Sequence, residues 1–385
     1  MSIWTKPAAL ALLALAALSA SAQETVLDPA SSFKINFPAD SPVTLVSFDL
    51  GGSKATARGG AVMLDLNSGL LLRNGSGKRI RGVTLLVLAQ DFTPGGRASV
   101  AVPALDVAPG ENFPVRIDLR MLRPLVAGGG PLVQVLLDGV LFDDLSFFGE
   151  NRLNSRRSLT IWELEARRDR KHFQQLLEAR GPDALQRELV ASVARLQDRP
   201  RLDVQISRRG TLPRPANAPA TVYEPDRQVQ FSFLRLPDAP IELTNGLATV
   251  SGNEAKAPSI DIQNRQSKAI RHLELGWVVR TKDGAEFLAG TLPADVQLAA
   301  NGKTRVVDEA ALRLNSRTGT RVVIDNLVGF AHSVEFADGQ LWIPSRAALE
   351  DPRLARLMPP SPEEQRLVEL YRKRGLKALL EDLRK

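Results

Sequence analysis

The sequence predicts a mainly β protein in which two tandem β-sandwich domains are each followed by α-helix. Runs of four to eight residues with alternating apolar positions recur between Gly, Pro, Asn and Asp residues, a pattern typical of short sandwich strands. Two segments of the chain align with each other at an offset of 190 residues. After each segment, apolar residues at three- and four-residue spacing indicate helices.

The internal repeat is clearest between residues 70–87 and residues 260–277, which align without a gap. In each copy, two predicted strands flank a turn of the pattern Asn-x-x-x-Lys. The matched pairs are Leu72 and Ile262, Asn74 and Asn264, Lys78 and Lys268, Ile80 and Ile270, Arg81 and Arg271, and Leu85 and Leu275. Further along, Val140, Phe142, Asp144 and Phe148 correspond to Val334, Phe336, Asp338 and Trp342. We therefore expect each copy to be a β-domain that ends in a helix.

The first residues have the pattern of a signal peptide. Lys6 precedes an apolar run over residues 8–18, and Ala20-Ser21-Ala22 is an A-x-A cleavage site. The run is shorter than the ~20 residues that a membrane-spanning helix needs. We expect cleavage after Ala22 and a periplasmic or secreted mature chain without a transmembrane segment.

The composition excludes several kinds of chemistry. The chain has no cysteine, which rules out disulfides, thiolate metal sites and cysteine nucleophiles. Its three histidines, His172, His272 and His332, are isolated from each other in the sequence, so no zinc-binding motif is present. Aromatic residues make up 5% of the chain, too few to favour nucleic-acid binding by base stacking. We expect no cofactor.

The domain boundaries follow from these patterns. The expected parts are a signal peptide (1–22), a first β-sandwich (23–154), a helical hairpin (155–199), a Pro-rich linker (200–219), a second β-sandwich (220–345) and C-terminal helices (346–385). Residues 159–179 and 183–196 are the two arms of the hairpin, separated by Gly181-Pro182. Residues 346–358 are expected to be helical, and Ser361 is expected to cap a final amphipathic helix.

Basic residues supply the candidate binding surface. The formal net charge is +7, and residues 152–180 contain eight basic residues against four acidic ones. An anionic polymer or an acidic protein surface is a suitable partner for such a stretch. The alternative is a solvated helix face. The candidate residues here are Arg156, Arg157, Arg167, Arg168, Arg170 and Lys171.

A second candidate surface lies at the repeated turns. Lys78 and Arg81 in the first copy match Lys268 and Arg271 in the second, which would give two equivalent anion-binding positions. The alternative is structural. In that interpretation the Asn of each turn adopts left-handed geometry, and Lys and Arg lie on an exposed strand edge where they deter edge-to-edge pairing.

Catalytic carboxylates are the remaining possibility. Asp138, Asp143 and Asp144 surround an apolar strand and could supply acid and base groups. In the second copy Asp338 persists opposite Asp144, but Ala337 stands opposite Asp143, which favours a role in the turn.

The segment "IDIQNRQSKAIRHLELGWVVRTKDG", from Ile260 to Gly284, resembles the strand-turn-strand core of bacterial immunoglobulin-like modules of the FxLYD and CARDB kind. The resemblance covers some 25 residues in each copy. It implies immunoglobulin-like sandwiches that serve as extracytoplasmic binding or spacer modules, and it assigns no functional residue.

Together these patterns predict a non-enzymatic binding or scaffolding protein of the cell envelope. Its expected partner is an envelope protein or an anionic envelope polymer, with no nucleic acid. An envelope-polymer hydrolase that uses Asp143 and Asp144 is one alternative, and a purely structural spacer is the other.

Overall fold

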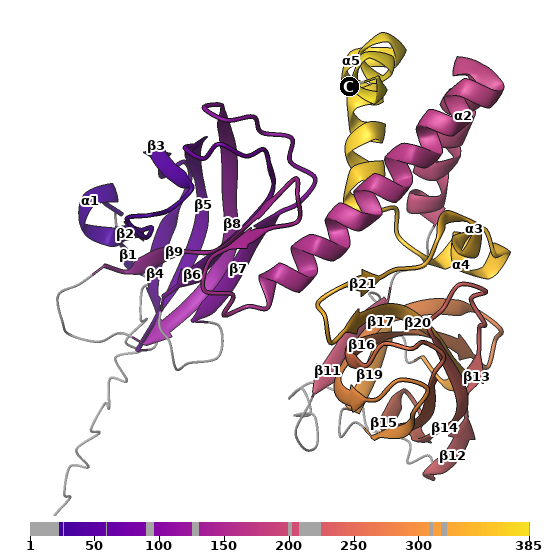
Figure 1. The fold of residues 1–385 in the computed structure, drawn as a ribbon. Helices are drawn as coiled ribbons and strands as arrows, with labels where there is room; N and C mark the ends of the chain where they lie inside the picture. Colours follow the sequence, from indigo (N-terminus) through magenta and orange to yellow (C-terminus); the bar gives the residue numbers. More distant parts are fainter. Residues whose placement is uncertain are drawn as a thin grey trace, which may run out of the picture. The chain divides into compact units, whose positions relative to one another are not determined.

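The computed structural model describes residues 23–25, 27–58, 60–89, 96–124, 131–198, 202–207, 225–307, 311–316 and 322–384 (Figure 1). The expected signal peptide lies outside these residues, as does most of the expected Pro-rich linker. The contacts of the chain divide it into two units, Met1–Ser155 and Arg156–Lys385. Each unit is considered by itself.

Unit 1 contains two sheets. Sheet A has the order β1-β4-β5-β3, and β8 pairs with the other edge of β5. Sheet B has the order β10-β9-β6-β7, and β2 pairs in parallel with β9. The strands are β1 (Gln23–Thr25), β2 (Phe33–Asn36), β3 (Val43–Asp49), β4 (Lys54–Arg58), β5 (Ala61–Asn74), β6 (Ile80–Leu88), β7 (Arg97–Val102), β8 (Asn112–Pro124), β9 (Val133–Phe142) and β10 (Phe147–Phe148), with a short helix α1 (Pro29–Ser32).

The two sheets of unit 1 enclose one hydrophobic core. Alternate residues of the long strand β5 are buried, from Val62 to Leu72, and they pack with Val83, Leu85 and Val135 of sheet B. This alternation is the expected signature of a strand with one face in the core. The prediction of a mainly β protein with a sandwich-like arrangement of sheets is confirmed.

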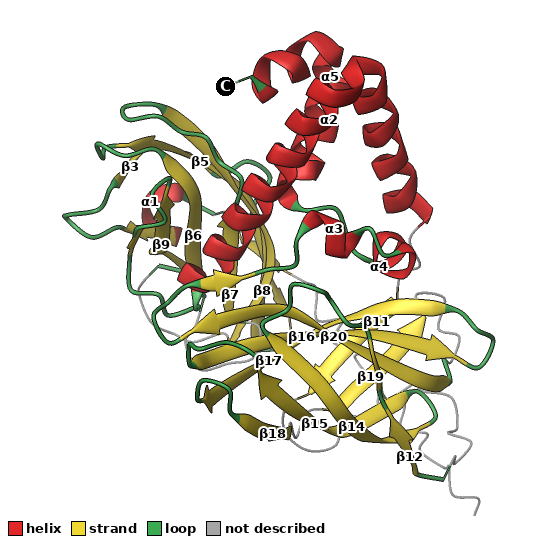
Figure 2. Ribbon diagram, turned by 45° about the vertical axis from the view of Figure 1, so that its right-hand side comes forward, coloured by secondary structure: helices red, strands yellow, loops and turns green. Residues whose placement is uncertain are grey.

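Unit 2 repeats this plan. Sheet C has the order β11-β19-β15-β14-β12, with β18 on β15, and sheet D has the order β13-β20-β16-β17, with β21 on β20 (Figure 2). The strands are β11 (Leu202–Ser207), β12 (Arg227–Gln230), β13 (Ser232–Phe233), β14 (Ile241–Ser251), β15 (Glu254–Asn264), β16 (Ile270–Thr281), β17 (Glu286–Leu298), β18 (Lys303–Val307), β19 (Ala311–Ser316), β20 (Ile324–Phe336) and β21 (Leu341–Trp342).

Corresponding strands of the two units make corresponding pairs. β13 runs parallel to β20 as β2 runs parallel to β9, and the hairpin of β20 with β21 matches that of β9 with β10. In the core of unit 2, Trp277 is 2% exposed and packs against Phe231 with their ring centroids 4.9 Å apart. The alignment at an offset of 190 residues thus corresponds to a repeated sheet topology.

The turn after β5 and the turn after β15 are held in the same way. The Asn74 Nδ2 donates to the carbonyls of Lys78 (2.9 Å) and Val107 (3.1 Å), and its Oδ1 accepts from the Ser76 N–H (3.0 Å). The Asn264 Nδ2 donates to the carbonyls of Lys268 (2.8 Å) and Ala299 (2.9 Å). Its Oδ1 accepts from the Gln266 N–H (2.9 Å). Both Asn side chains are fully buried.

The structural alternative for these turns, in which Asn adopts left-handed geometry and Lys and Arg protect a strand edge, is therefore wrong in two respects. Neither Asn has a positive φ, so each is needed for its hydrogen bonds and not for left-handed geometry. The strands β6 and β16, which follow the turns, are paired on both sides, so Lys78, Arg81, Lys268 and Arg271 do not protect a sheet edge.

The long helix α2 (Ser155–Asp198) bends into a hairpin at Gly181, where φ is 77°. Gly181 tolerates this conformation because it has no Cβ, and Pro182 begins the second arm without needing an N–H donor. The predicted arms and their separator thus coincide with one helix that bends at the predicted position.

Asp138, which is buried in unit 1, accepts from the N–H groups of Arg152 (2.8 Å) and Leu153 (3.3 Å) just before α2 begins.

Residues 346–358, which were expected to be helical, are helical with one interruption. The structure has two short helices, α3 (Arg346–Leu349) and α4 (Pro352–Leu357). Pro352 cannot continue a helix from the preceding turn, and the Asp351 carboxylate instead caps α4 by accepting from the Arg353 N–H (2.9 Å). Both short helices pack on the outer face of sheet D, through Ala348, Leu354 and Leu357.

The last helix, α5 (Pro362–Leu383), begins as predicted, because the Ser361 Oγ accepts from the Glu364 N–H (3.1 Å). It also bends, at Gly375, where φ is 76°. The apolar residues of α5 pack against α2, and the buried set is Phe173, Leu185, Leu189, Leu367, Leu379 and Leu383. Among the described residues no helix is both long and apolar enough to cross a membrane.

The bend in α5 reveals a second repeat, which the sequence analysis missed. At an offset of 194 residues, Gly181 matches Gly375, Phe173 matches Leu367, Leu185 matches Leu379, Leu189 matches Leu383 and Asp169 matches Glu363. All ten residues are at the bends or among the most buried of the helices. The repeated segment is therefore a pair of sheets followed by a helical hairpin.

We expect Asn264→Ala to lower the free energy of unfolding of unit 2 by about 2 kcal/mol, because two buried carbonyls and one N–H lose their partner. The measurement is urea unfolding of residues 23–385, monitored by tryptophan fluorescence. This signal reports on unit 2, since Trp162, Trp277 and Trp342 all lie there. Gln266→Ala, which changes an exposed side chain of the same turn, is the control. A loss no larger than that of the control would contradict the role given to Asn264.

Candidate functional site

The basic residues at the repeated turns form hydrogen bonds and ion pairs with other residues of the chain. The Lys78 Nζ donates to Asp144 (2.7 Å) and to the Ser146 Oγ (3.0 Å). The Lys268 Nζ donates in the same way to Asp338 (2.7 Å) and Gln340 (2.8 Å). In each copy the lysine therefore ties the turn before β6 or β16 to the hairpin that follows β9 or β20.

The two arginines predicted at these turns are paired as well. Arg81 binds Asp106 (2.7 Å), and Arg271 binds Glu335. Asp106 follows β7, whereas Glu335 lies in β20, so the two arginines do not have equivalent partners. The structure thus does not assemble Lys78, Arg81, Lys268 and Arg271 into a free cationic surface.

The candidate catalytic carboxylates take part in these turns. The hydrogen bond from Lys78, followed by those from Ser146, holds the pKa of Asp144 well below its usual range. The hydrogen bond from Lys268 likewise lowers the pKa of Asp338. Such carboxylates remain ionised and are poor general acids. Asp143 is an exposed neighbour, and Asp138 is buried in β9, where its carboxylate accepts from the Oγ of Ser155, the first residue of α2.

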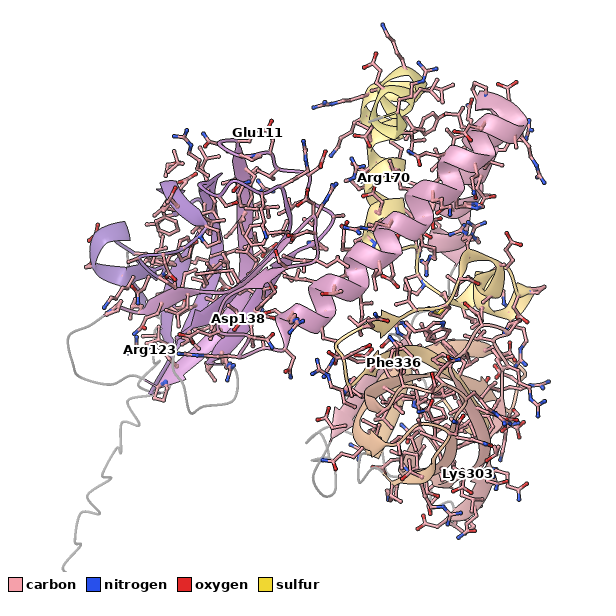
Figure 3. All side chains as sticks on the ribbon, viewed as in Figure 1. Glu111, Arg123, Asp138, Arg170, Lys303 and Phe336 are labelled. Carbon is pink, nitrogen blue, oxygen red and sulfur yellow. The ribbon has the colours of Figure 1, made fainter. Side chains whose placement is uncertain are left out.

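Four of the predicted basic residues of α2 form ion pairs. Arg157 binds Glu335 (2.7 Å), and Arg167 binds Glu163 (2.7 Å). Arg168 binds Asp169 through two hydrogen bonds (2.8 and 3.0 Å), and Arg170 binds Glu363 of α5 (2.9 Å). Figure 3 shows Arg170 on α2 at the side that faces α5. Arg156 and Lys171 are exposed.

These pairs centre on buried carboxylates that sequence reasoning did not single out. Asp169 and Glu363 are fully buried, and Glu364 is 3% exposed. Arg346 lies within 3.5 Å of Asp169, 3.2 Å of Glu364 and 3.6 Å of Glu188. The equivalence of Asp169 and Glu363 in the helical repeat is the signal that would have identified them. We call these residues the arginine–carboxylate network: Arg168, Arg170, Arg346, Asp169, Glu188, Glu363 and Glu364.

The network forms one wall of a cleft of about 510 Å³ between α2, α3, α4 and the start of α5. Arg168, Arg195 and Arg346 face Asp169, Glu188 and Glu364 in this wall, so its charges balance. Apolar residues such as Leu176, Leu349 and Met358 complete the lining. Burial is the larger cause, and the charge of Arg346 the smaller one, of a lowered pKa of His172 at the rim of the cleft.

The cleft has the size of a small-molecule site but offers no activated nucleophile. Of the four arginines that line the cleft, Arg168, Arg195 and Arg346 are already paired, and Arg180 is exposed. Among the described residues of the chain, no three His, Asp or Glu side chains are arranged so that they could hold a metal ion. The geometry of the cleft is suited to holding the helices together and to admitting a ligand. The cleft provides no acid–base pair.

Exposed cations also lie at the bends of the two helical hairpins. Arg180 precedes Gly181, and Arg374 precedes Gly375, in equivalent positions of the helical repeat. Arg180, Arg374 and nearby Lys377 are exposed and form no ion pair with any residue that the structure describes. In Figures 1 and 2 both bends lie at the end of the helices that is farthest from sheets C and D.

The C-terminal bend carries the denser charge. Arg372 is 64% exposed and Lys373 is 72% exposed, and they share a single acidic partner, Glu369, at 3.8 and 2.8 Å. With Arg374 and Lys377 they place four basic residues within six positions. We call Arg372, Lys373, Arg374 and Lys377 the basic bend.

Comparisons with known proteins give no family. No protein-family model matches the sequence, and no curated protein is detectably similar to it. The C-terminal globular domain of an oligosaccharyltransferase from Pyrococcus abyssi is 10% identical, with a TM-score of 0.14; the match covers 79% of this chain and 48% of that one. An allantoicase structure is 10% identical over 74% of this chain and 89% of that one, with a TM-score of 0.09.

A third structure, of native PhpD with cadmium atoms, is 11% identical over 90% of this chain and 85% of that one, with a TM-score of 0.10. The chain thus spans about half of the length of the first of these structures, at 48%. Similarities at this level carry no argument about fold or function.

We expect Glu363→Gln to destabilise the packing of α2 on α5 by about 3 kcal/mol, because Arg170 and Arg366 would lose a buried anionic partner. The measurement is the loss of far-UV circular dichroism of the helices in a urea titration. Glu381→Gln, on the exposed side of the same helix, is the matched control. Equal midpoints for the two variants would refute the structural importance of the buried carboxylate.

Proposed function

We propose that the chain is a non-enzymatic binding or scaffolding protein of the cell envelope that binds an anionic envelope polymer. In this proposal the export signal at residues 1–22 is removed after Ala22, and the mature chain works in the periplasm or outside the cell. The two sandwich-like units are immunoglobulin-like domains, and each is followed by a helical hairpin. The second β-domain was expected to begin near residue 220, but its sheet C already includes β11, and the C-terminal helices begin at residue 346.

The immunoglobulin-like assignment is supported by two features of each unit. Two sheets of mostly antiparallel strands face each other across one core, and a short parallel strand pairs with a strand of the second sheet. Domains of this architecture commonly serve as binding or spacer modules outside the cytoplasm, which is an argument from analogy.

The observation that carries the proposal is the division of the cations into two groups. The arginines of the α2 face are neutralised by buried or neighbouring carboxylates, whereas the basic bend and Arg180 are exposed at the ends of the hairpins. An exposed cluster with one shared carboxylate keeps a positive potential that attracts polyanions. The proposed contact therefore lies at the bends and not at the originally predicted set from Arg156 to Lys171.

The test is binding of residues 23–385 to an anionic polysaccharide such as alginate, measured by sedimentation at 0.05 and 0.3 M salt. We expect a variant with Arg372, Lys373, Arg374 and Lys377 changed to Gln to bind at least tenfold more weakly at low salt, and wild-type affinity to fall as salt rises.

The matched control changes four exposed lysines that are far along the chain from the bend, Lys34, Lys54, Lys282 and Lys303, to Gln. If the control loses as much affinity as the bend variant, net charge and not the basic bend drives binding. If neither the wild type nor any variant binds saturably, the structural spacer replaces the proposal.

The hydrolase alternative makes a different prediction. Asp143→Asn and Asp144→Asn should leave polymer binding unchanged, because both residues belong to a turn of unit 1. Release of reducing ends from the polymer by wild-type chain, lost in these two variants, would instead support a carboxylate hydrolase.

A further inference from the structure

The cleft between α2, α3, α4 and the start of α5 keeps two charged groups that the ion pairs of its wall do not use. Three arginines and three carboxylates of this wall pair with one another: Arg168 with Asp169, Arg195 with Glu188, and Arg346 with Glu364. Arg180 and Glu350 line the same cleft. Both are exposed, and neither forms an ion pair with any residue that the structure describes. The cleft therefore offers one cation and one anion to a ligand.

The free anion lies near the middle of the first arm of α2. Glu350 directly follows α3, and the Arg346 guanidinium of that helix lies 5.9 Å from the ring centroid of Phe173. The charge of Glu350 also acts on His172, where it opposes the fall in pKa that burial and Arg346 cause. Both observations place Glu350 close to the part of α2 that carries His172 and Phe173.

The free cation lies further along the same arm. Arg180 is the last residue before the bend at Gly181, eight positions after His172. At a rise of about 1.5 Å per residue, the two positions are about 12 Å apart along the helix axis. His172, Leu176 and Arg180 are four positions apart, so they lie in a row on one face of α2, and all three line the cleft. The row thus runs from the level of Glu350 to Arg180.

Much of the remaining lining is apolar. Leu176 of α2, Leu349 of α3 and Met358, which follows α4, are among these residues. Gln175 also lines the cleft, is exposed, and forms no hydrogen bond through its side chain with the described residues. Its amide can both donate to and accept from a peptide group. Such a lining suits a ligand that carries apolar side chains on a backbone of amide groups.

We propose that this cleft binds a short peptide with free ends, whose ammonium group pairs with Glu350 and whose carboxylate pairs with Arg180. An extended chain rises about 3.3–3.6 Å per residue, so three to four residues span about 12 Å. Leu176, Leu349 and Met358 then receive its apolar side chains. The inference does not rest on the proposed function, in which an anionic polymer binds the basic bend.

The charges of the cleft disfavour other classes of ligand. A polyanion would meet Arg180 but would also bring negative charge beside Glu350 and Glu364, which repel it. A single amino acid carries both charges, but its ammonium and carboxylate groups are too close together to reach Glu350 and Arg180 at once. A neutral ligand would pair with neither residue.

The experiment is isothermal titration of residues 23–385 with the tripeptide Leu-Ala-Leu at pH 7. We expect saturable binding at one site per chain. Acetylation of the amino end and amidation of the carboxyl end should each weaken binding by about tenfold or more, because each removes one charge-assisted hydrogen bond. Free leucine should bind more weakly than the tripeptide by a similar factor, since it cannot span the two charges.

Two substitutions assign the two ends of the peptide. Glu350→Gln should weaken binding of the free tripeptide by about tenfold and remove the effect of acetylation. Arg180→Gln should weaken it by a similar factor and remove the effect of amidation. Both residues are exposed, so neither change removes a buried contact.

Glu178→Gln and Arg187→Gln change exposed residues of α2 outside the cleft, and these matched controls should bind the tripeptide as the wild type does. The variant with all four residues of the basic bend changed to Gln should do so as well, which separates this site from the polymer contact.

Absence of saturable tripeptide binding would overturn the proposal. Equal affinity of the wild-type chain for the free and the doubly blocked tripeptide would overturn it too, and this comparison needs no substitution. A loss in the control variants as large as that in Arg180→Gln or Glu350→Gln would show that net charge determines binding, with the same consequence.

Discussion

The placement of the helices in unit 2 depends on carboxylates that have no access to water. Asp169 and Glu363 are fully buried, and an ionised carboxylate in that position is tolerable only with cationic partners in direct contact. Arg168 and Arg346 supply them for Asp169, and Arg170 and Arg366 supply them for Glu363. Apolar packing alone would allow several rotations of one hairpin on the other, whereas these pairs fix one.

The same requirement explains why the basic composition was a poor guide to a binding surface. An excess of arginine in residues 152–180 is visible in the sequence, but whether each arginine faces solvent or a buried acid depends on residues nearly 200 positions away, such as Glu363. Sequence spacing does show local pairs, as with Glu163 and Arg167. It does not show pairs between α2 and α5.

The strands, their turns and the duplication could be predicted, because alternation of apolar residues and the repeated Asn-x-x-x-Lys pattern are local features. The role of Asn74 and Asn264 could not, since a buried amide that joins carbonyls from separate strands and an amide in a left-handed turn have the same sequence signature. The break at Pro352 was readable from the chain, and the bend at Gly375 became visible only once its match with Gly181 was known.

The arginine–carboxylate network also has a consequence for behaviour on heating. The cost of removing charged groups from water falls as temperature rises, because their hydration is entropically unfavourable, while the stabilisation from apolar burial levels off. The helices held by Asp169 and Glu363 should therefore lose less of their stability on warming than the sandwich cores, which contain few buried charges. On heating, the sandwich cores should then unfold before the helical hairpins.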